Sequence, residues 1–112
     1  MGVISSNVYA LTDQATIAID ATLGTVFSVT LGGNRTIGAP TNPSPNQVII
    51  LKVKQDGGGS KTLSWNAVFA FSADLPAPTL TTTANHTDLL GFLYSSTVSK
   101  WLYIAEVKDF NI

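Results

Sequence analysis

Residues 25–31 read Thr-Val-Phe-Ser-Val-Thr-Leu and alternate between apolar and polar side chains. Phe27, Val29 and Leu31 fall on one face of an extended chain, because successive side chains of a strand point to opposite faces. The other face carries mostly hydroxyl groups. β-branched and aromatic residues dominate the run, and these residues favour strands over short helices. The stretch therefore predicts a strand with one buried face.

The same period of two recurs along most of the chain. Residues 47–55 are apolar on both faces in their first half, as in a strand that is covered on both sides. Residues 99–107 alternate again, and one face of this run consists of Trp101, Tyr103, Ala105 and Val107. The predicted strands are residues 8–12, 15–20, 25–31, 34–38, 47–55, 60–65, 79–83, 87–95 and 99–107. No segment predicts a long helix.

Two glycine-rich turns separate these runs. Residues 31–35 read Leu-Gly-Gly-Asn-Arg and predict a tight hairpin, because Gly and Asn tolerate the positive φ of such turns. Residues 55–60 read Gln-Asp-Gly-Gly-Gly-Ser and predict a looser hairpin that leads into residues 61–65. Eight or nine short strands at intervals of about 8–12 residues predict an all-β fold, an antiparallel β-sandwich with a jelly-roll-like arrangement. The strand order stays open.

The length of 112 residues fits one domain. We expect residues 8–112 to form a single β-sandwich domain, preceded by residues 1–7 as an N-terminal arm. Residues 1–6 have neither the basic stretch nor the apolar core of a secretory signal, so we expect synthesis in the cytoplasm without a signal peptide. The longest strictly apolar run, residues 48–51, is far shorter than the roughly 20 residues of a membrane span.

Charge and cysteine content exclude several classes of function. Charged residues make up 12% of the chain, about half of the usual share, and the net charge is −1. The six basic residues are scattered, whereas nucleic-acid binding uses clustered cations. The chain has no cysteine, which excludes disulfides, thiolate metal sites and cysteine nucleophiles. We therefore expect no nucleic-acid partner and no membrane partner.

Candidate catalytic groups are few. The single histidine, His86, lies two residues before Asp88, so the two side chains would share one face of a strand. A polar loop before the strand at residues 89–95 explains the same residues without catalysis, and no Gly-x-Ser-x-Gly motif is present. Most carboxylates occupy turn or strand-end positions, where Asp forms local hydrogen bonds. We expect a non-enzymatic protein without a cofactor or a metal site.

Aromatic residues raise the alternative of carbohydrate binding. Stacking on a sugar requires an exposed ring, and Trp101 and Tyr103 alternate in phase with the core positions of their strand. Trp65 precedes the irregular segment 66–68 and is the best candidate for glycan stacking.

Seven segments in a characteristic order and spacing carry a family resemblance. They are Leu-Thr-Asp-Gln-Ala-Thr-Ile-Ala (11–18), Leu-Gly-Gly-Asn-Arg-Thr-Ile (31–37), Pro-Thr-Asn-Pro (40–43), Gln-Asp-Gly-Gly-Gly-Ser-Lys-Thr-Leu (55–63), Pro-Thr-Leu-Thr-Thr-Thr (78–83), Thr-Asp-Leu-Leu-Gly-Phe (87–92) and Lys-Trp (100–101). Over residues 8–107 the chain resembles a β-rich module of tailed-bacteriophage virion proteins, of the tail-fibre C-terminal and capsid decoration type. The resemblance implies a virion component, commonly a homotrimer, and brings no catalytic residues.

Two functions follow from this resemblance. In fibre proteins such a module sits behind a long shaft, whereas this chain starts at Met1, so we expect a capsid decoration (cement) protein that stabilises the outer capsid. Its partners would be the major capsid protein or other virion proteins. The expected capsid-docking arm consists of Val3, Ile4, Ser5, Ser6 and Asn7. The alternative is a tail-fibre or receptor-binding tip module whose ligand is a host surface glycan. A small hydrolase would require a converging histidine, carboxylate and nucleophile.

Overall fold

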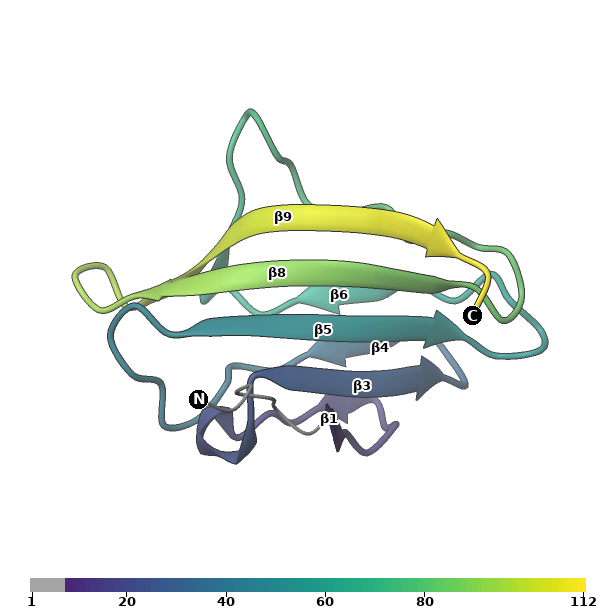
Figure 1. Cartoon of the computed structure of the whole chain (residues 1–112), viewed down its shortest axis with the longest axis horizontal. Helices are drawn as coiled ribbons and strands as arrows, with labels where there is room; N and C mark the ends of the chain where they lie inside the picture. The colour runs from purple at the N-terminus through teal and green to yellow at the C-terminus, as the bar shows by residue number, and fades with distance from the viewer. Residues whose placement is uncertain (1–7) are drawn as a thin grey trace, which may run out of the picture.

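The computed structural model describes residues 8–112 (Figure 1). Within this range the chain forms nine strands and one short 3-10 helix, η1 (Ala21–Leu23). The strands are β1 (Val8–Ala10), β2 (Thr16–Ile17), β3 (Val26–Leu31), β4 (Arg35–Ile37), β5 (Val48–Gln55), β6 (Leu63–Trp65), β7 (Phe69–Ala70), β8 (Thr87–Ser95) and β9 (Lys100–Phe110). The prediction of an all-β chain is confirmed.

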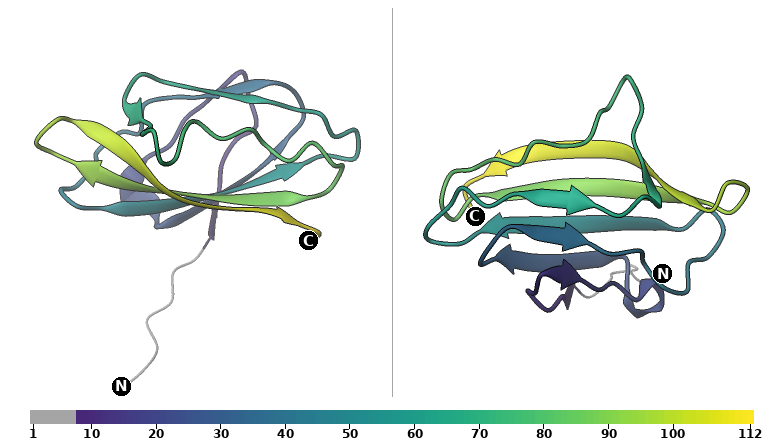
Figure 2. Two further views of the ribbon diagram at one scale, coloured as in Figure 1. Left: turned by 90° about the horizontal axis from the view of Figure 1, so that it is seen from above. Right: turned by 180° about the vertical axis from the view of Figure 1, so that it is seen from behind.

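The strands form two sheets with one core between them (Figure 2). The larger sheet has the order β1-β3-β5-β8-β9-β7 and the smaller sheet the order β2-β4-β6. From β1 to β6 the chain alternates between the two sheets, so each turn of the chain adds one strand to each sheet. Successive strands within each sheet are therefore parallel, as in β1–β3, β3–β5, β2–β4 and β4–β6.

The prediction of antiparallel pairing is wrong for most strand pairs, and the jelly-roll-like arrangement is not confirmed. Only β5–β8 and β8–β9 are antiparallel in the described part of the chain, and β7–β9 adds a further parallel pair. Alternation of side chains has the same period of two in parallel and antiparallel strands, so it does not determine the direction of pairing. The N-terminal half therefore passes back and forth between the two sheets. Strands β8 and β9 form an antiparallel hairpin in the larger sheet.

The predicted hairpin at residues 31–35 is a corner that carries the chain from β3 to β4 in the other sheet. Gly32 and Gly33 do not have positive φ. They are needed because a side chain at either position would clash with a neighbouring side chain. A Cβ atom on Gly32 would lie 2.8 Å from Asp13 Oδ2, and one on Gly33 would lie 2.6 Å from Arg35 Nη1. The corner is therefore shaped around the ion pair between Asp13 and Arg35.

The predicted hairpin at residues 55–60 is a second corner, from β5 to β6. Gly59 has φ of 62°, and a Cβ atom on it would lie 2.5 Å from the carbonyl oxygen of Thr82. Glycine is required here for its backbone conformation and for the close approach of another segment.

The core confirms the alternation in residues 25–31. Phe27, Val29 and Leu31 are buried, and they face Ile17 and Ile37 of the smaller sheet. Apolar side chains from both sheets thus share one cluster, which holds the two layers together.

The alternation in residues 99–107 holds only for its first half. Trp101 and Tyr103 are buried, but Val107 is 56% exposed. A register shift separates the pair Tyr103–Phe92 from the pair Ala105–Gly91, so one residue of β9 has no partner on β8. Such a bulge reverses which side chains face the core. The prediction that Ala105 and Val107 share the face of Trp101 is therefore wrong.

Residues 79–83 were expected to form a strand, but they belong to neither sheet. Buried side chains hold this segment instead of a ladder: Thr81 N–H donates to Asp88 Oδ2 at 2.8 Å, and Gln55 Nε2 donates to the Thr81 carbonyl at 2.8 Å. The short strand β7, which pairs with β9, was not predicted.

Candidate functional site

An apolar row crosses the outer face of the larger sheet, the face that points away from β2, β4 and β6. Register places its members opposite one another on five neighbouring strands. The row consists of Val8, Val26, Ile50, Gly91 and Ala105. Neighbours along the chain such as Phe27 and Leu90 point into the core, so the row faces outward. Figure 1 looks onto this face, with β4 and β6 behind it.

Further apolar side chains widen this surface beyond the row. Leu89 lies opposite Val107, and Leu93 lies opposite Leu102. The side chains of Val107 and Ile104 are 56% and 50% exposed. Contiguous exposed apolar surface on a protein is typical of a docking site for another protein. We call this surface, together with the apolar row, the outer apolar face.

The C-terminal segment forms one wall of a hollow on this face. Thr87 Oγ1 donates to the Ile112 carbonyl at 3.0 Å, which holds the segment after β9 against β8. The hollow has a volume of about 300 Å³. Its lining consists of Val26, Ile50, Lys52, Leu89, Phe110 and Ile112. A single large apolar side chain from a partner would fit a hollow of this lining.

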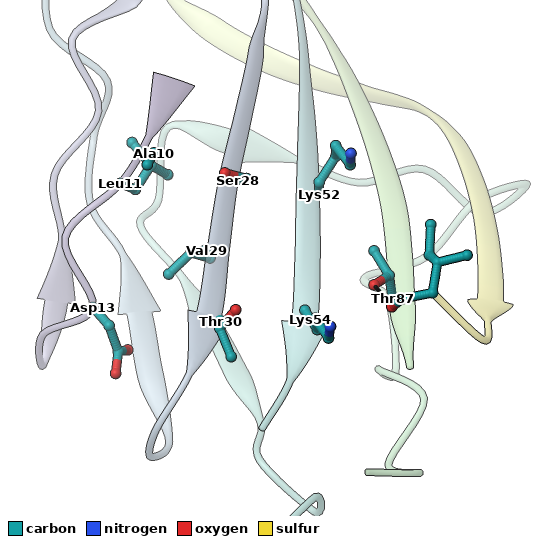
Figure 3. Close-up of a pocket in the computed structure, with 10 residues that line it drawn as sticks. Ala10, Leu11, Asp13, Ser28, Val29, Thr30, Lys52, Lys54 and Thr87 are labelled. Atoms are coloured by element: carbon teal, nitrogen blue, oxygen red, sulfur yellow. Dashed lines mark hydrogen bonds between the residues drawn. The ribbon is translucent and has the colours of Figure 1, made fainter. Parts of the chain in front are cut away.

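A larger groove of about 580 Å³ adjoins the hollow (Figure 3). Lys52 and Lys54 project from β5 at successive outward positions. They lie opposite Ser28 and Thr30 of β3, so hydroxyl groups flank the two ammonium groups. Asp13 lies at the far side of the groove, as Figure 3 shows.

The Asp13 carboxylate in this groove already accepts hydrogen bonds from the fold. Arg35 donates to Asp13 through Nε at 2.8 Å and through Nη2 at 3.1 Å, and Gly32 N–H donates at 3.0 Å. The hydrogen bond from Arg35 lowers the pKa of Asp13, and the Gly32 N–H adds to this effect against partial burial, which raises it. Across residues 8–112, no carboxylate lies within salt-bridge distance of Lys52 or Lys54. The groove therefore has a net positive character.

The candidate catalytic residues do not converge on this face. His86 Nδ1 contacts Asp109 Oδ1 at 2.5 Å rather than Asp88. Asp88 is buried and accepts hydrogen bonds from the backbone N–H groups of Thr81 and Asp109. Its two oxygens thus serve the fold. In the described range, no three His, Asp or Glu residues are grouped so that they could hold a metal ion.

Trp65 is half-buried between the sheets. Its ring packs against three phenylalanine rings, with centroid distances of 5.1 Å to Phe69, 5.9 Å to Phe71 and 5.3 Å to Phe92. Trp65 Nε1 is buried without a hydrogen-bond partner in the part of the chain described. Glycan stacking at Trp65 stays a prediction. The predicted docking-arm residues Val3, Ile4, Ser5, Ser6 and Asn7 lie outside the described residues.

Sequence reasoning pointed to part of the outer apolar face and missed the rest. The apolar first half of residues 47–55 signalled a strand with two apolar faces, and Ile50 belongs to the face now exposed. Ala105 and Val107 were placed on the same face as Trp101 and Tyr103, because the bulge between Tyr103 and Ala105 leaves no mark in the alternation.

No family model, no curated protein and no solved structure matches the chain. In residues 8–112, no helix is long and apolar enough to cross a membrane.

Proposed function

We propose that the chain is a structural protein of a virion, a non-enzymatic capsid decoration protein that binds the outer capsid and stabilises it. The observation that carries the structural role is the outer apolar face, which spans five strands of the larger sheet. The virion assignment rests on the resemblance of residues 8–107 to phage modules. The two sheets and their shared core would form the β-sandwich of such a module.

Physical chemistry favours an assembled state for this chain. Burying the half of the Val107 or Ile104 side chain that the fold leaves exposed contributes roughly 1 kcal/mol. A net charge of −1 provides little repulsion between copies. A protein that binds the assembled shell and not its free subunits stabilises the shell by mass action.

The arm at residues 1–7 is the proposed contact with the capsid. It includes Val3 and Ile4, whose apolar side chains suit a hydrophobic contact, and the polar residues Ser5, Ser6 and Asn7. If the arm binds the capsid, the outer apolar face remains free for contacts with other copies of the chain.

The experiment is immunogold labelling of the tailed-phage particles whose genome encodes the chain. We expect gold over the whole head. Label confined to the tail tip would overturn the decoration role and support the receptor- or glycan-binding tip, and particles without label would overturn the virion assignment.

Reconstitution tests the arm. Purified protein is sedimented with capsids that lack it, and the double variant Val3→Asp with Ile4→Asp is compared with Ser5→Ala with Ser6→Ala as the matched control. We expect the wild-type protein and the control to sediment with the shells and the Asp variant to stay in solution. Equal binding of all three proteins would overturn the proposed role of the arm.

A further inference from the structure

Of the seven side-chain carboxylates of the chain, six have a partner among the described residues and one has none there. Asp13 pairs with Arg35, Asp20 with Thr22 and Asn42, Asp56 with Lys61, Asp88 with Thr81 and Asp109 N–H, Glu106 with Tyr103 and Lys108, and Asp109 with His86. Asp74 is exposed and has no hydrogen bond or ion pair with any described residue. It is thus an acidic group that the fold leaves available.

The basic residues divide in the same way. Arg35, Lys61, Lys100 and Lys108 each donate to an oxygen of the fold. Lys52 and Lys54 donate to none in the described chain, and they stand side by side in the groove on the outer face (Figure 3). Among the side chains of residues 8–112, the unpaired charges are therefore a double positive site on β5 and a single negative site at Asp74.

Asp74 lies on a loop that projects from the molecule. The chain between β7, the edge strand of the larger sheet, and residue 78 rises beyond β9 in Figures 1 and 2. Phe71 anchors its base, since its ring lies 5.9 Å from that of Trp65 and 5.4 Å from that of Tyr103. The tip is closed on itself by Ser72, whose Oγ accepts from Leu75 N–H at 3.1 Å and whose N–H donates to the Leu75 carbonyl. The loop is a preformed projection with an acidic tip.

Within one molecule the acidic tip and the lysine pair are apart. The strands β8 and β9 lie between β5 and the edge from which the loop projects. Lys52 and Lys54 also point out of the plane of the sheet, whereas the loop extends past its edge (Figure 1). A contact between the two charged sites is therefore a contact between two copies of the chain.

We infer that the outer apolar face binds a second copy of this chain, with the Asp74 loop of one copy seated in the groove beside Lys52 and Lys54 of the next. The two surfaces differ, so the contact is head-to-tail, and a head-to-tail contact closes into a ring when its rotation permits. The inference stands apart from the virion assignment, because it concerns the isolated chain.

The molecule is broad enough on this side for an interface with a second copy. The molecule measures 39 by 38 Å across its two longer axes, and Figure 1 views it along the shortest axis, onto the larger sheet. A standard interface takes roughly 800 Å² from each partner. Apolar side chains around the groove supply the affinity. The contact of Asp74 with Lys52 and Lys54 determines which surface of the second copy binds.

Charge reversal tests the contact. Three variants are compared with the wild-type protein by sedimentation equilibrium: Asp74→Lys, Lys52→Glu with Lys54→Glu, and all three substitutions together. We expect the wild-type chain to associate. Each one-sided reversal should raise the dissociation constant at least about tenfold, because like charges then meet in the contact. The triple variant should recover most of the lost affinity, because the charges are again complementary.

A variant away from Lys52, Lys54 and Asp74 controls for net charge. Lys100→Glu alters the charge by as much as Asp74→Lys, in the opposite direction, at a lysine that donates to the Ala67 carbonyl. It should associate like the wild-type protein, and thermal melting of every variant checks that the fold is retained. A monomeric wild-type chain, unchanged association of Asp74→Lys, or a triple variant as weak as the one-sided reversals would each overturn the inference. Failure of particle labelling would leave this result unaffected.

Discussion

Gln55 and Lys61 hydrogen-bond to each other in both directions. Gln55 Nε2 donates to the Lys61 carbonyl, and Lys61 N–H donates to Gln55 Oε1, both at 2.9 Å. The same Nε2 donates to the Thr81 carbonyl at 2.8 Å, and Gln55 is only 2% exposed. One buried amide thus satisfies three backbone groups at the corner where β5 ends. It joins this corner to residues 79–83, which have no strand ladder of their own.

Gln55→Ala should therefore be one of the most destabilising single changes in the chain. It leaves partly buried backbone groups of Lys61 and Thr81 without partners, and each such loss costs about 1–3 kcal/mol. We expect the free energy of unfolding to fall by about 3 kcal/mol in urea denaturation. Gln14→Ala, at an exposed glutamine, is the control and should change it by less than about 0.5 kcal/mol. Similar losses in the two variants would contradict the role of Gln55.

Gly59→Ala tests the corner from the backbone side. The substitution meets a positive φ of 62° and places Cβ 2.5 Å from the Thr82 carbonyl oxygen, so backbone must move. We expect a loss of about 2 kcal/mol or more. Gly57→Ala is the matched control in the same turn, because no atom lies within 4 Å of its Cβ position. Thermal unfolding of the two variants should separate them clearly, and equal midpoints would refute this account of Gly59.

The pair of Asp13 and Arg35 should make stability depend on pH in the acid range. Hydrogen bonding from Arg35 lowers the pKa of Asp13 in the folded chain below its ordinary value of 3.8. The pair therefore stabilises the fold above that value, and the contribution is lost as the pH falls through the lowered pKa. We expect Asp13→Asn to be less stable than the wild-type protein at pH 7 and the difference to shrink toward pH 2. Denaturation curves at several pH values measure it, and a constant difference would contradict the pairing.

The side-chain faces of several strands could be predicted from sequence, because burial acts on each strand separately. Phe27, Val29 and Leu31 alternate with polar residues, and the same three are buried. Pairing direction could not be predicted, since it depends on which sheet the next strand joins. The corner at residues 31–35 has hairpin composition, yet its glycines accommodate the Asp13–Arg35 pair.

The candidate site was harder to predict for a related reason. Lys52 and Lys54 read as the polar face of a strand, and only the tertiary structure reveals that they lack partners among the described residues while other cations have them. In the sequence, Asp74 looks like an ordinary turn residue. Only the structure shows that the other side-chain carboxylates have partners among the described residues and that Asp74 has none there. Long-range pairing of charges is a property of the fold that local sequence does not encode.

The bulge in β9 leads to a prediction about chain length. Tyr103 pairs with Phe92 and Ala105 with Gly91, which leaves Ile104 as the extra residue. Deleting Ile104 would leave the side chains before and after it on the same faces of the sheet as now. We therefore expect a folded chain with Trp101 still buried. Deleting Leu102 instead makes Trp101 and Tyr103 neighbours, and adjacent residues of a strand face opposite sides.

One of the two rings must then leave the core, at a cost of about 3–5 kcal/mol. Tryptophan fluorescence during urea denaturation distinguishes the two deletions when both chains also carry Trp65→Phe, because Trp101 then emits alone and is 1% exposed in the native fold. The chain without Ile104 should unfold cooperatively from a state with a buried, blue-shifted emission. The chain without Leu102 should unfold at much lower urea or be unfolded from the start. Lower stability in urea of the chain without Ile104 than of the chain without Leu102 would contradict this account of Ile104 as the extra residue of the bulge.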